Sequence, residues 1–412
     1  MKTLSLNASQ KTKQTPAGEI PVDWALPSLG QLVSMRSGGT PARSNEEFWS
    51  GEKPWFSGKD LKSFRLTDSI EHISEIAVKS GTRLAPINSL LILVRGMTLL
   101  KEVPIGLLTR QASFNQDIKA MIPNKKLVDP TYLGYCILAY NRRLQNMVTI
   151  AGHGTGRLQL EALTEFPIPL PPLPEQKKIA AILSTWDRAI EAQQALIAAK
   201  TERKRGLMQQ LLTGIKRLPG FKGKWPKQKF GDFLTESRLL GSDGSTAQKI
   251  TIKLYGKGVF PKNEVRIGSK NTKYYSRREG QFIYSKLDFL NGAFAILPQH
   301  LDGYESTLDL PAFDVNENAD PRWLLAYVRR PYFYTKQVGA AAGGRKARRV
   351  NPNEFLALSL KTPPIEEQTA IADLLDAASK EITLLTEQLE TLREQKRGLM
   401  QNLLTGKVRV KP

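Results

Sequence analysis

The side chains best suited to chemistry in this sequence are basic and amide groups in glycine-rich loops. Two such loops are Gly152-His153-Gly154-Thr155-Gly156-Arg157 and residues 343–349, with the sequence GGRKARR. Glycine lets a backbone approach a phosphate closely, and arginine supplies the positive charge that a phosphate attracts. Asn115 and Gln116 add two amides, which are groups that can pair with adenine through two hydrogen bonds. We interpret these loops as contacts for nucleic acid; a basic hinge into the next helix is the alternative.

The full set of candidate DNA-contacting residues combines basic, amide, hydroxyl and aromatic side chains in segments expected to be loops or strand ends. Taken singly, each segment also fits an ordinary solvated turn, so the prediction depends on the whole set. The set is Ser37, Thr40, Arg43, Lys59, Arg95, Asn115, Gln116, Arg157, Lys253, Tyr255, Lys257, Lys273, Tyr275, Arg277, Lys286, Arg345, Lys346, Arg348 and Arg349.

No group of residues has the spacing of a catalytic or metal site. The three histidines, His72, His153 and His300, are scattered, and the sequence has no GxxxxGK[ST] phosphate-binding loop. The single cysteine, Cys136, lies in an apolar segment, where a buried and unreactive thiol is expected. Residues 351–355, NPNEF, resemble the signature of amino-methyltransferases but lack its second proline. We therefore expect a chain with no enzymatic activity and with no metal or cofactor of its own.

The charge of the chain points to a polyanionic partner. Its 412 residues include 60 lysines and arginines against 39 acidic residues, a formal charge of +21. Such an excess attracts polyanions; nucleic acid is the first candidate and a membrane surface the second, while a surface kept basic for solubility is the plain alternative. No run of about 18 apolar residues occurs, and the first residues lack the apolar core of a signal peptide. A cytoplasmic location is expected.

An internal repeat must position these loops. Residues 171–214 and 363–406 match without a gap at an offset of 192, and both end in the sequence LLTG. Upstream, Trp24 and Gly30 correspond to Trp225 and Gly231 at an offset of 201. The segments between, residues 31–150 and 232–342, show no similarity that we can align. The pattern predicts a duplicated frame that holds two different globular domains.

Both repeated segments are predicted to be long helices. Their apolar residues recur at alternating steps of three and four, the pattern of a coiled-coil seam, and helices of about 36–40 residues are expected. Prolines precede both segments, and Gly214 and Gly406 suit left-handed caps at their ends. We expect an antiparallel pair, because the domain between the helices must bring the chain back; two unrelated surface helices are the alternative. The seam residues are Ile179, Leu183, Trp186, Ile190, Ile197, Leu207, Ile371, Leu375, Ile382, Leu385, Leu389, Leu392 and Leu399, with Gln193, Lys200 and Lys204 as polar members of the first seam.

The two middle segments predict a mixed α/β (α+β) fold. In the first, residues 89–94 are expected to form a buried strand and residues 128–150 a helix. In the second, short strands are expected at residues 249–254, 280–284 and 293–297, and a helix at 321–334. The expected parts of the chain are an arm at residues 1–22, a domain at 23–170, a helix at 171–217, a domain at 218–362 and a helix at 363–412.

This arrangement resembles the specificity subunit of Type I restriction–modification enzymes. The resemblance is carried by the twin segments PPLPEQ…RKRGLMQQLLTG and PPIEEQ…EQKRGLMQNLLTG, by LTEFPIPLPP at residues 163–172, and by the SGGTP, FW and PW series at residues 37–55. It covers nearly the whole chain. It implies two target-recognition domains, each of which reads one half of a bipartite, asymmetric DNA site. It also implies that the paired helices set the unread spacer.

The same resemblance implies that partner subunits carry the chemistry. Two DNA methyltransferase (modification) subunits, which bind S-adenosylmethionine, would dock on the helices, and restriction/translocase subunits using ATP and Mg²⁺ would join them. This chain would contact double-stranded DNA and no membrane. Two alternatives stay open: a coiled-coil adaptor that binds an acidic protein without DNA, and a nuclease or methyltransferase whose motif is not visible.

Overall fold

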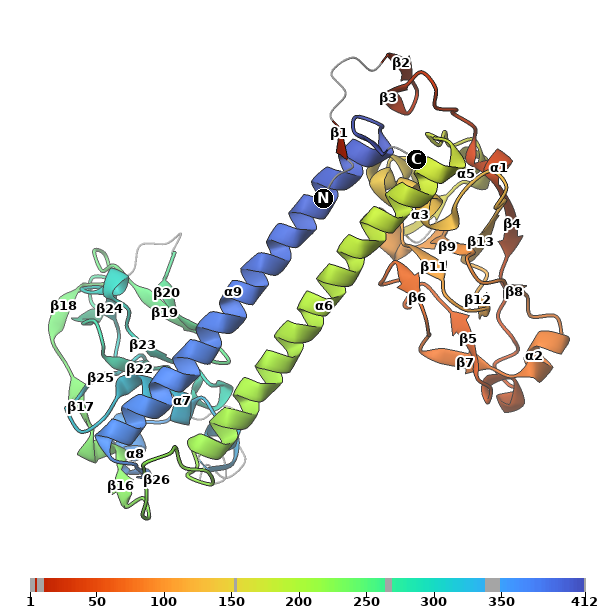
Figure 1. Cartoon of the computed structure of the whole chain (residues 1–412). Helices are drawn as coiled ribbons and strands as arrows, with labels where there is room; N and C mark the ends of the chain where they lie inside the picture. The colour runs from red at the N-terminus through yellow and green to blue at the C-terminus, as the bar shows by residue number, and fades with distance from the viewer. Residues whose placement is uncertain (1–3, 6–10, 152–153, 264–268, 338–348, 411–412) are drawn as a thin grey trace. The chain divides into compact units, whose positions relative to one another are not determined.

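The chain forms two compact units that share two long helices. The structure, a computed structural model, describes residues 4–5, 11–151, 154–263, 269–337 and 349–410. Unit 1 comprises Met1–Gln193 and Gln388–Pro412, and unit 2 comprises Gln194–Glu387. The helices α6 (Leu173–Leu211) and α9 (Ile365–Leu404) each give one half to each unit (Figure 1). The mixed α/β fold with two long helices is therefore confirmed.

A five-stranded sheet with the order β4-β13-β9-β11-β6 lies at the centre of unit 1. Its neighbours are antiparallel except β11 and β6. Strand β9 (Leu90–Leu93) is the buried strand expected from the sequence, and all four of its residues are buried. Two smaller sheets have the orders β7-β5-β12-β8 and β10-β15-β14. The other strands are β4 (Val33–Ser37), β5 (Lys53–Phe56), β6 (Arg65–Leu66), β7 (Glu71–Ile73), β8 (Leu84–Ala85), β10 (Arg95–Gly96), β11 (Ile105–Leu108), β12 (Ala112–Phe114), β13 (Ile118–Pro123), β14 (Val148–Ala151) and β15 (Thr155–Leu158).

The helix expected at residues 128–150 is shorter and broken. Helix α3 (Pro130–Ala139) begins after Asp129, whose carboxylate accepts hydrogen bonds from two backbone N–H groups of the first turn. After a break at Tyr140 comes the short α4 (Asn141–Gln145), and the expected helix end is instead strand β14. The prediction of one helix was wrong because residues 148–151 are fixed by antiparallel pairing with β15, a contact that helical periodicity does not contain.

The core of unit 2 is aromatic. Phe282 and Phe355 stack with ring centroids 5.6 Å apart, and Tyr284 and Phe313 stack at 5.7 Å. The three expected strands appear as β19, β22 and β23, whereas helix α7 (Pro321–Val328) stops early because Pro331 has no N–H with which to continue it. The remaining bounds are β16 (Lys227–Lys229), β17 (Leu234–Ser237), β18 (Leu240–Asp243), β19 (Ile250–Lys253), β20 (Gly258–Pro261), β21 (Lys273–Ser276), β22 (Phe282–Tyr284), β23 (Phe294–Ile296), β24 (Glu305–Ser306), β25 (Ala312–Val315), α8 (Pro352–Ala357) and β26 (Ser359–Lys361).

The halves of α6 and α9 pair antiparallel in each unit. In unit 1, the Nε2 of Gln193 donates to the Oε1 of Gln388 at 3.2 Å, and Lys396 forms an ion pair with Asp187. In unit 2, Lys200 forms an ion pair with Glu381 at 2.5 Å. Every residue of the predicted seams is buried or partly buried in its unit. Six of them, Ile179, Leu183, Leu207, Ile371, Leu375 and Leu399, belong to or pack against the apolar cores of the two units.

A buried ion pair, which we call the latch, joins the two long helices at the end of each helix pair. In unit 1, Arg409 donates two hydrogen bonds of 2.8 Å to Glu175, which is 2% exposed. In unit 2, Arg217 donates to Glu367 at 2.6 and 2.5 Å, and Glu367 is fully buried. Both pairs are related by the sequence offset of 192. The repeat therefore includes a buried ion pair that joins the start of one long helix to the segment after the other.

A tryptophan packs against the glycine that ends each long helix, next to the latch. Gly214 and Gly406 both have a φ of +71°, as expected for left-handed caps. A Cβ at Gly214 would lie 3.2 Å from Trp225, and one at Gly406 would lie 3.2 Å from Trp24. The two tryptophans that open the repeated domains therefore pack against the ends of the long helices. In unit 1 the latch segment also forms strand β27 (Arg409–Val410), which pairs with β1 (Leu4–Ser5).

Candidate nucleic-acid interface

Four segments that are distant in the sequence converge at one edge of the domain in unit 1. The N–H of Asn115 donates to the carbonyl of Phe56 at 2.9 Å, and the N–H of Gly39 donates to that of Phe114 at 2.9 Å. A third backbone bond, from Val94, reaches the same loop at 2.9 Å. Most of the candidate residues expected in the first domain therefore lie near one another. The four segments are residues 37–40, 57–60, 94–97 and 113–117.

Arg95 and Arg157 are direct neighbours across two strands. They are Cα partners in the antiparallel pair of β10 and β15, and both are exposed. Like charges placed opposite each other in a sheet repel, and no ion pair with an acidic residue is present for either side chain in the part of the chain that the structure describes. Two such guanidinium groups at the converging edge can bind a phosphate backbone.

The loops beside this pair carry neutral hydrogen-bonding groups. The hydroxyl of Thr40 donates to the Oε1 of Gln116 at 2.6 Å, and Lys119 donates to the hydroxyl of Ser37 at 2.5 Å. A Cβ on Gly38 would lie 2.2 Å from the carbonyl oxygen of Phe114, so this close approach of two loops requires glycine. Gln116 is exposed, and its amide group is of a kind that can contact a base edge. Lys59 is also exposed.

Arg43 is held by its own domain. Its guanidinium forms an ion pair with Glu71 and lies 3.6 Å from the ring centroid of Trp49. This pair raises the pKa of Arg43 and lowers the pKa of Glu71, mainly through the shared hydrogen bond. Because the charge is already neutralised, we expect Arg43 to position the loop rather than to bind phosphate.

In unit 2, the hairpin of β19 and β20 presents Tyr255 at its tip. Tyr255 is 68% exposed and has a φ of +59°, a left-handed conformation that bulky residues rarely adopt. Its N–H donates to the carbonyl of Asn291 at 2.9 Å, which holds the turn in place. Lys253 and Lys257 flank it and are exposed. An exposed aromatic ring between two lysines suits stacking and phosphate contact.

The predicted DNA-contacting residues on and just after strand β21 lie partly at the surface and partly in the interior. Lys273 is exposed and Tyr275 is partly buried. Arg277 is fully buried, and its guanidinium donates to the hydroxyl of Ser306 at 2.8 Å and to two backbone carbonyls. Burial lowers the pKa of Arg277 to about 10. We correct its assignment as a DNA contact, because a side chain consumed by internal hydrogen bonds cannot reach a phosphate.

The remaining candidates of unit 2 lie near the end of its domain. The N–H of Val350 donates to the carbonyl of Lys286 at 3.1 Å, so Arg349 and Lys286 belong to neighbouring backbone segments. Arg349 is exposed and lies 3.3 Å from the carboxylate of Asp309. Three candidates lie outside the described residues: Arg345, Lys346 and Arg348.

Two exposed apolar side chains lie beside the pair of Arg95 and Arg157 and were not expected from the sequence. Met97 and Ile150 are each 72% exposed. Met97 follows β10 directly, and Ile150 pairs with Gly156 on β15. Apolar side chains of this kind can contact the methyl group of thymine. No pattern in the sequence distinguishes such residues from core residues, since exposure is set by the fold.

The described residues contain no group of three or more histidine, cysteine or acidic side chains placed to hold a metal ion. Cys136 is buried, and burial raises its pKa to about 12. The thiol is therefore protonated at neutral pH, so it is not a nucleophile.

Comparison with known proteins shows that this chain is similar to specificity subunits of restriction enzymes. Residues 21–199 match the family model of the Type I restriction modification DNA specificity domain. A Type I restriction enzyme specificity subunit of Escherichia coli is 34% identical over 168 residues, which are 40% of this chain and 41% of that protein. A putative Type I restriction enzyme specificity subunit of Methanocaldococcus jannaschii is 22% identical, and the alignment covers 99% of each chain. The chain is therefore similar to the specificity subunits of Type I restriction enzymes.

Solved structures show the same fold over nearly the full length. The S subunit of a Type I restriction–modification system from M. genitalium has a TM-score of 0.56 at 12% identity, covering 97% of this chain and 98% of that one. A chain from a study of complex assembly in the Type I system has a TM-score of 0.58 at 15% identity, covering 94% and 99%. Within the described residues, none of the helices combines the length and the apolar character needed to cross a bilayer.

Proposed function

We propose that this chain is the DNA sequence-specificity subunit of a Type I restriction–modification complex. Each domain reads one half of a bipartite, asymmetric site in double-stranded DNA. The observation that carries this proposal is a duplicated frame, closed by the ion pairs of Arg409 and Arg217, around two domains that differ in sequence and in fold. The main sheet of unit 1 has five strands, whereas that of unit 2 has four, in the order β17-β25-β22-β23. Since the domains differ, their half-sites differ. The open pair of Arg95 and Arg157 supplies phosphate contacts that fix the register of the first domain on the duplex.

The proposal assigns the chemistry to partner subunits. Two methyltransferase subunits dock on the paired helices and supply S-adenosylmethionine, and restriction/translocase subunits supply ATP and Mg²⁺. The chain itself is non-catalytic and works in the cytoplasm. The similarity to Type I specificity subunits and the buried, protonated Cys136 support this division of roles.

A footprint of the purified complex tests the two-domain model. We expect two protected segments separated by an unprotected spacer, together with methylation of a split motif in the host genome. A single continuous footprint would contradict the model. A chain that binds a partner protein but never duplex DNA at low salt would instead be an adaptor.

The spacer role is tested by the lengths of the helices. Removing seven residues from α6 and the facing seven from α9 preserves the seam pattern. We expect this double deletion to change the spacer length of the methylated motif or to abolish assembly. The control removes seven residues from α9 alone, which misaligns the pair of Lys200 with Glu381 and should prevent pairing. Unchanged site selection by the double deletion would refute the spacer role.

A further inference from the structure

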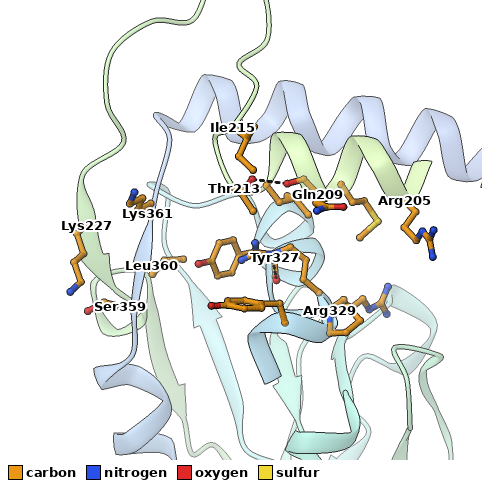
Figure 2. Close-up of a pocket in the computed structure, with 15 residues that line it drawn as sticks. Arg205, Gln209, Thr213, Ile215, Lys227, Tyr327, Arg329, Ser359, Leu360 and Lys361 are labelled. Carbon is orange, nitrogen blue, oxygen red and sulfur yellow. Dashed lines mark hydrogen bonds between the residues drawn. The ribbon is translucent and has the colours of Figure 1, made fainter. Parts of the chain in front are cut away.

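Unit 2 contains a groove of about 1000 Å³ that the proposed DNA contacts do not use. It lies between the C-terminal end of α6, the end of α7 and strand β26. Figure 2 shows Tyr327 and Leu360 within it, with Lys227 and Lys361 at one end and Arg205 and Arg329 at the other. The groove is thus apolar in its middle and basic at both ends.

The charge in this groove is unbalanced. Five of its described lining residues are lysine or arginine and none is acidic. The Nε of Arg329 is buried and has no hydrogen-bond partner among the described residues. Burial lowers the pKa of Arg329, and burial together with the charge of Arg329 lowers the pKa of the adjacent Lys204. A buried N–H of a guanidinium group that lacks an acceptor is costly, and the described cationic lining includes no acidic residue, so the groove favours an anionic ligand.

The corresponding position in unit 1 shows what is missing. By the offset of 192, Lys204 corresponds to Lys396, which forms an ion pair with Asp187. The residue equivalent to Asp187 in unit 2 is Ser379, and its hydroxyl donates to the carbonyl of Leu375 at 2.7 Å. Unit 1 therefore supplies a carboxylate that pairs directly with its lysine. In unit 2 the equivalent position is a hydroxyl engaged with its own helix, and the carboxylate near Lys204, that of Asp376, pairs with Arg322 at 3.2 Å.

Unit 1 also shows what kind of ligand fits. The hairpin of β2 (Thr12–Thr15) and β3 (Gly18–Pro21) contacts the segment after α9, since a Cβ on Gly406 would lie 2.4 Å from Pro21. Tyr140 donates to the carbonyl of Ala17 at 3.3 Å, and Ile20 is fully buried in the core. In unit 2 only residues 215–224 lie between Gly214 and Trp225, too few to form the latch segment and a comparable hairpin.

We propose that this groove of unit 2 is the docking site for an extended, apolar and acidic segment of a partner protein. The partner is a methyltransferase subunit, so this inference rests on the proposed function. Two exposed apolar side chains, Ile215 at 76% and Tyr332 at 66%, flank the groove. Apolar walls of this kind suit a polypeptide with carboxylate side chains and do not suit a DNA phosphate backbone. Only unit 2 has this docking site, because the hairpin of residues 12–21 packs at the equivalent place in unit 1.

The test uses the full chain and the purified cognate methyltransferase subunit. The variant Ile215→Asp/Lys227→Glu/Lys361→Glu changes only exposed residues, so the fold should persist. The control Ile70→Asp/Lys79→Glu/Lys125→Glu makes the same changes at exposed positions of unit 1. Native mass spectrometry and titration calorimetry then count the bound methyltransferase subunits.

We expect the wild type and the control to bind two subunits and the groove variant to bind one, or to bind the second at least ten-fold more weakly. Two subunits of unchanged affinity on the groove variant would overturn the proposal. If that variant instead loses affinity for duplex DNA as an isolated chain, the groove is a nucleic-acid contact and the proposal is also wrong. A wild type that binds no methyltransferase subunit would refute the proposed function itself.

A second measurement identifies the segment. A photo-crosslinking amino acid at position 215 should join this chain to a peptide of the methyltransferase subunit that contains apolar and acidic residues. Cross-links only to DNA, or to a basic peptide, would contradict the assignment.

Discussion

Replacing Arg217 by alanine should destabilise unit 2 far more than replacing an exposed arginine nearby. The carboxylate of Glu367 is fully buried and accepts two hydrogen bonds from Arg217 and one of 3.0 Å from the indole of Trp225. Without Arg217 this buried charge keeps only one neutral donor. Removing one partner of a buried pair costs about 3–5 kcal/mol, whereas an exposed pair contributes about 0–1 kcal/mol.

The matched control is Arg205→Ala. Arg205 is 78% exposed and pairs with Glu202 at 2.6 Å on the same helix. For a domain of this size, each kcal/mol shifts the melting temperature by about 2–4 °C. We therefore expect Arg217→Ala to lower the melting temperature of unit 2 by about 6–20 °C and the control by less than about 4 °C. Scanning calorimetry measures the shift, and hydrogen exchange of α7 assigns it to unit 2.

A double variant separates the buried charge from the loss of packing. In Arg217→Ala/Glu367→Gln the carboxylate is neutral, so part of the lost stability should return. The reasoning is wrong if the double variant is less stable than Arg217→Ala, or if Arg217→Ala and the control melt together. The equivalent variant Arg409→Ala should weaken unit 1 and leave the exchange of α7 unchanged, because its partner Glu175 belongs to unit 1.

Three further predictions concern the surface. Alanine at Arg95 or Arg157 should weaken binding uniformly across DNA sequences and reduce the salt slope of the affinity by about 1; an unchanged slope in filter binding would remove these residues from the interface. Tyr255→Asn, which tolerates a left-handed backbone, should leave the melting temperature equal or higher while DNA affinity falls, and full affinity would show that Tyr255 is no contact. The hydrogen bond from Arg409 lowers the pKa of Asp23 below 3.8, so the stability from this pair is present above about pH 4 and is lost as the pH falls through the lowered pKa. Urea melts at several pH values measure this loss. Melts that show no loss, or the same loss in Arg409→Ala, would contradict the prediction.

The frame was predictable from the sequence because it is periodic and duplicated. Apolar spacing located the seams, and the twin LLTG endings located both left-handed glycines. The arginine of each latch could also have been found from the sequence, because Arg217 and Arg409 follow those endings and keep the offset of 192. What the sequence lacked was the partner of each arginine, because a buried ion pair between segments some 150 or 234 residues apart requires the tertiary fold.

The candidate interface was predictable only as a set of regions. The pairing of Arg95 with Arg157 depends on strand register, and a shift of one residue would turn the side chains to opposite faces. Arg277 has the same local composition as its exposed neighbours, yet it lies in the core. Successive side chains along β21 and at Arg277 point to opposite faces of the sheet. The sequence does not tell which of these faces is covered by the rest of the domain. Burial in these domains is decided by contacts between segments that the repeat does not share.

The latches also explain why neither half of the sequence corresponds to a structural unit. Glu175 follows the first domain in the chain, but its partner Arg409 comes after the second long helix. Likewise Trp24 packs beside Gly406, and strand β1 pairs with β27. Unit 1 therefore needs residues 388–410 to cover its core and to neutralise a carboxylate that is 2% exposed. A frame built in this way ties each domain to both helices, so the domains can diverge in what they bind while the shared ion pairs keep the helix register fixed.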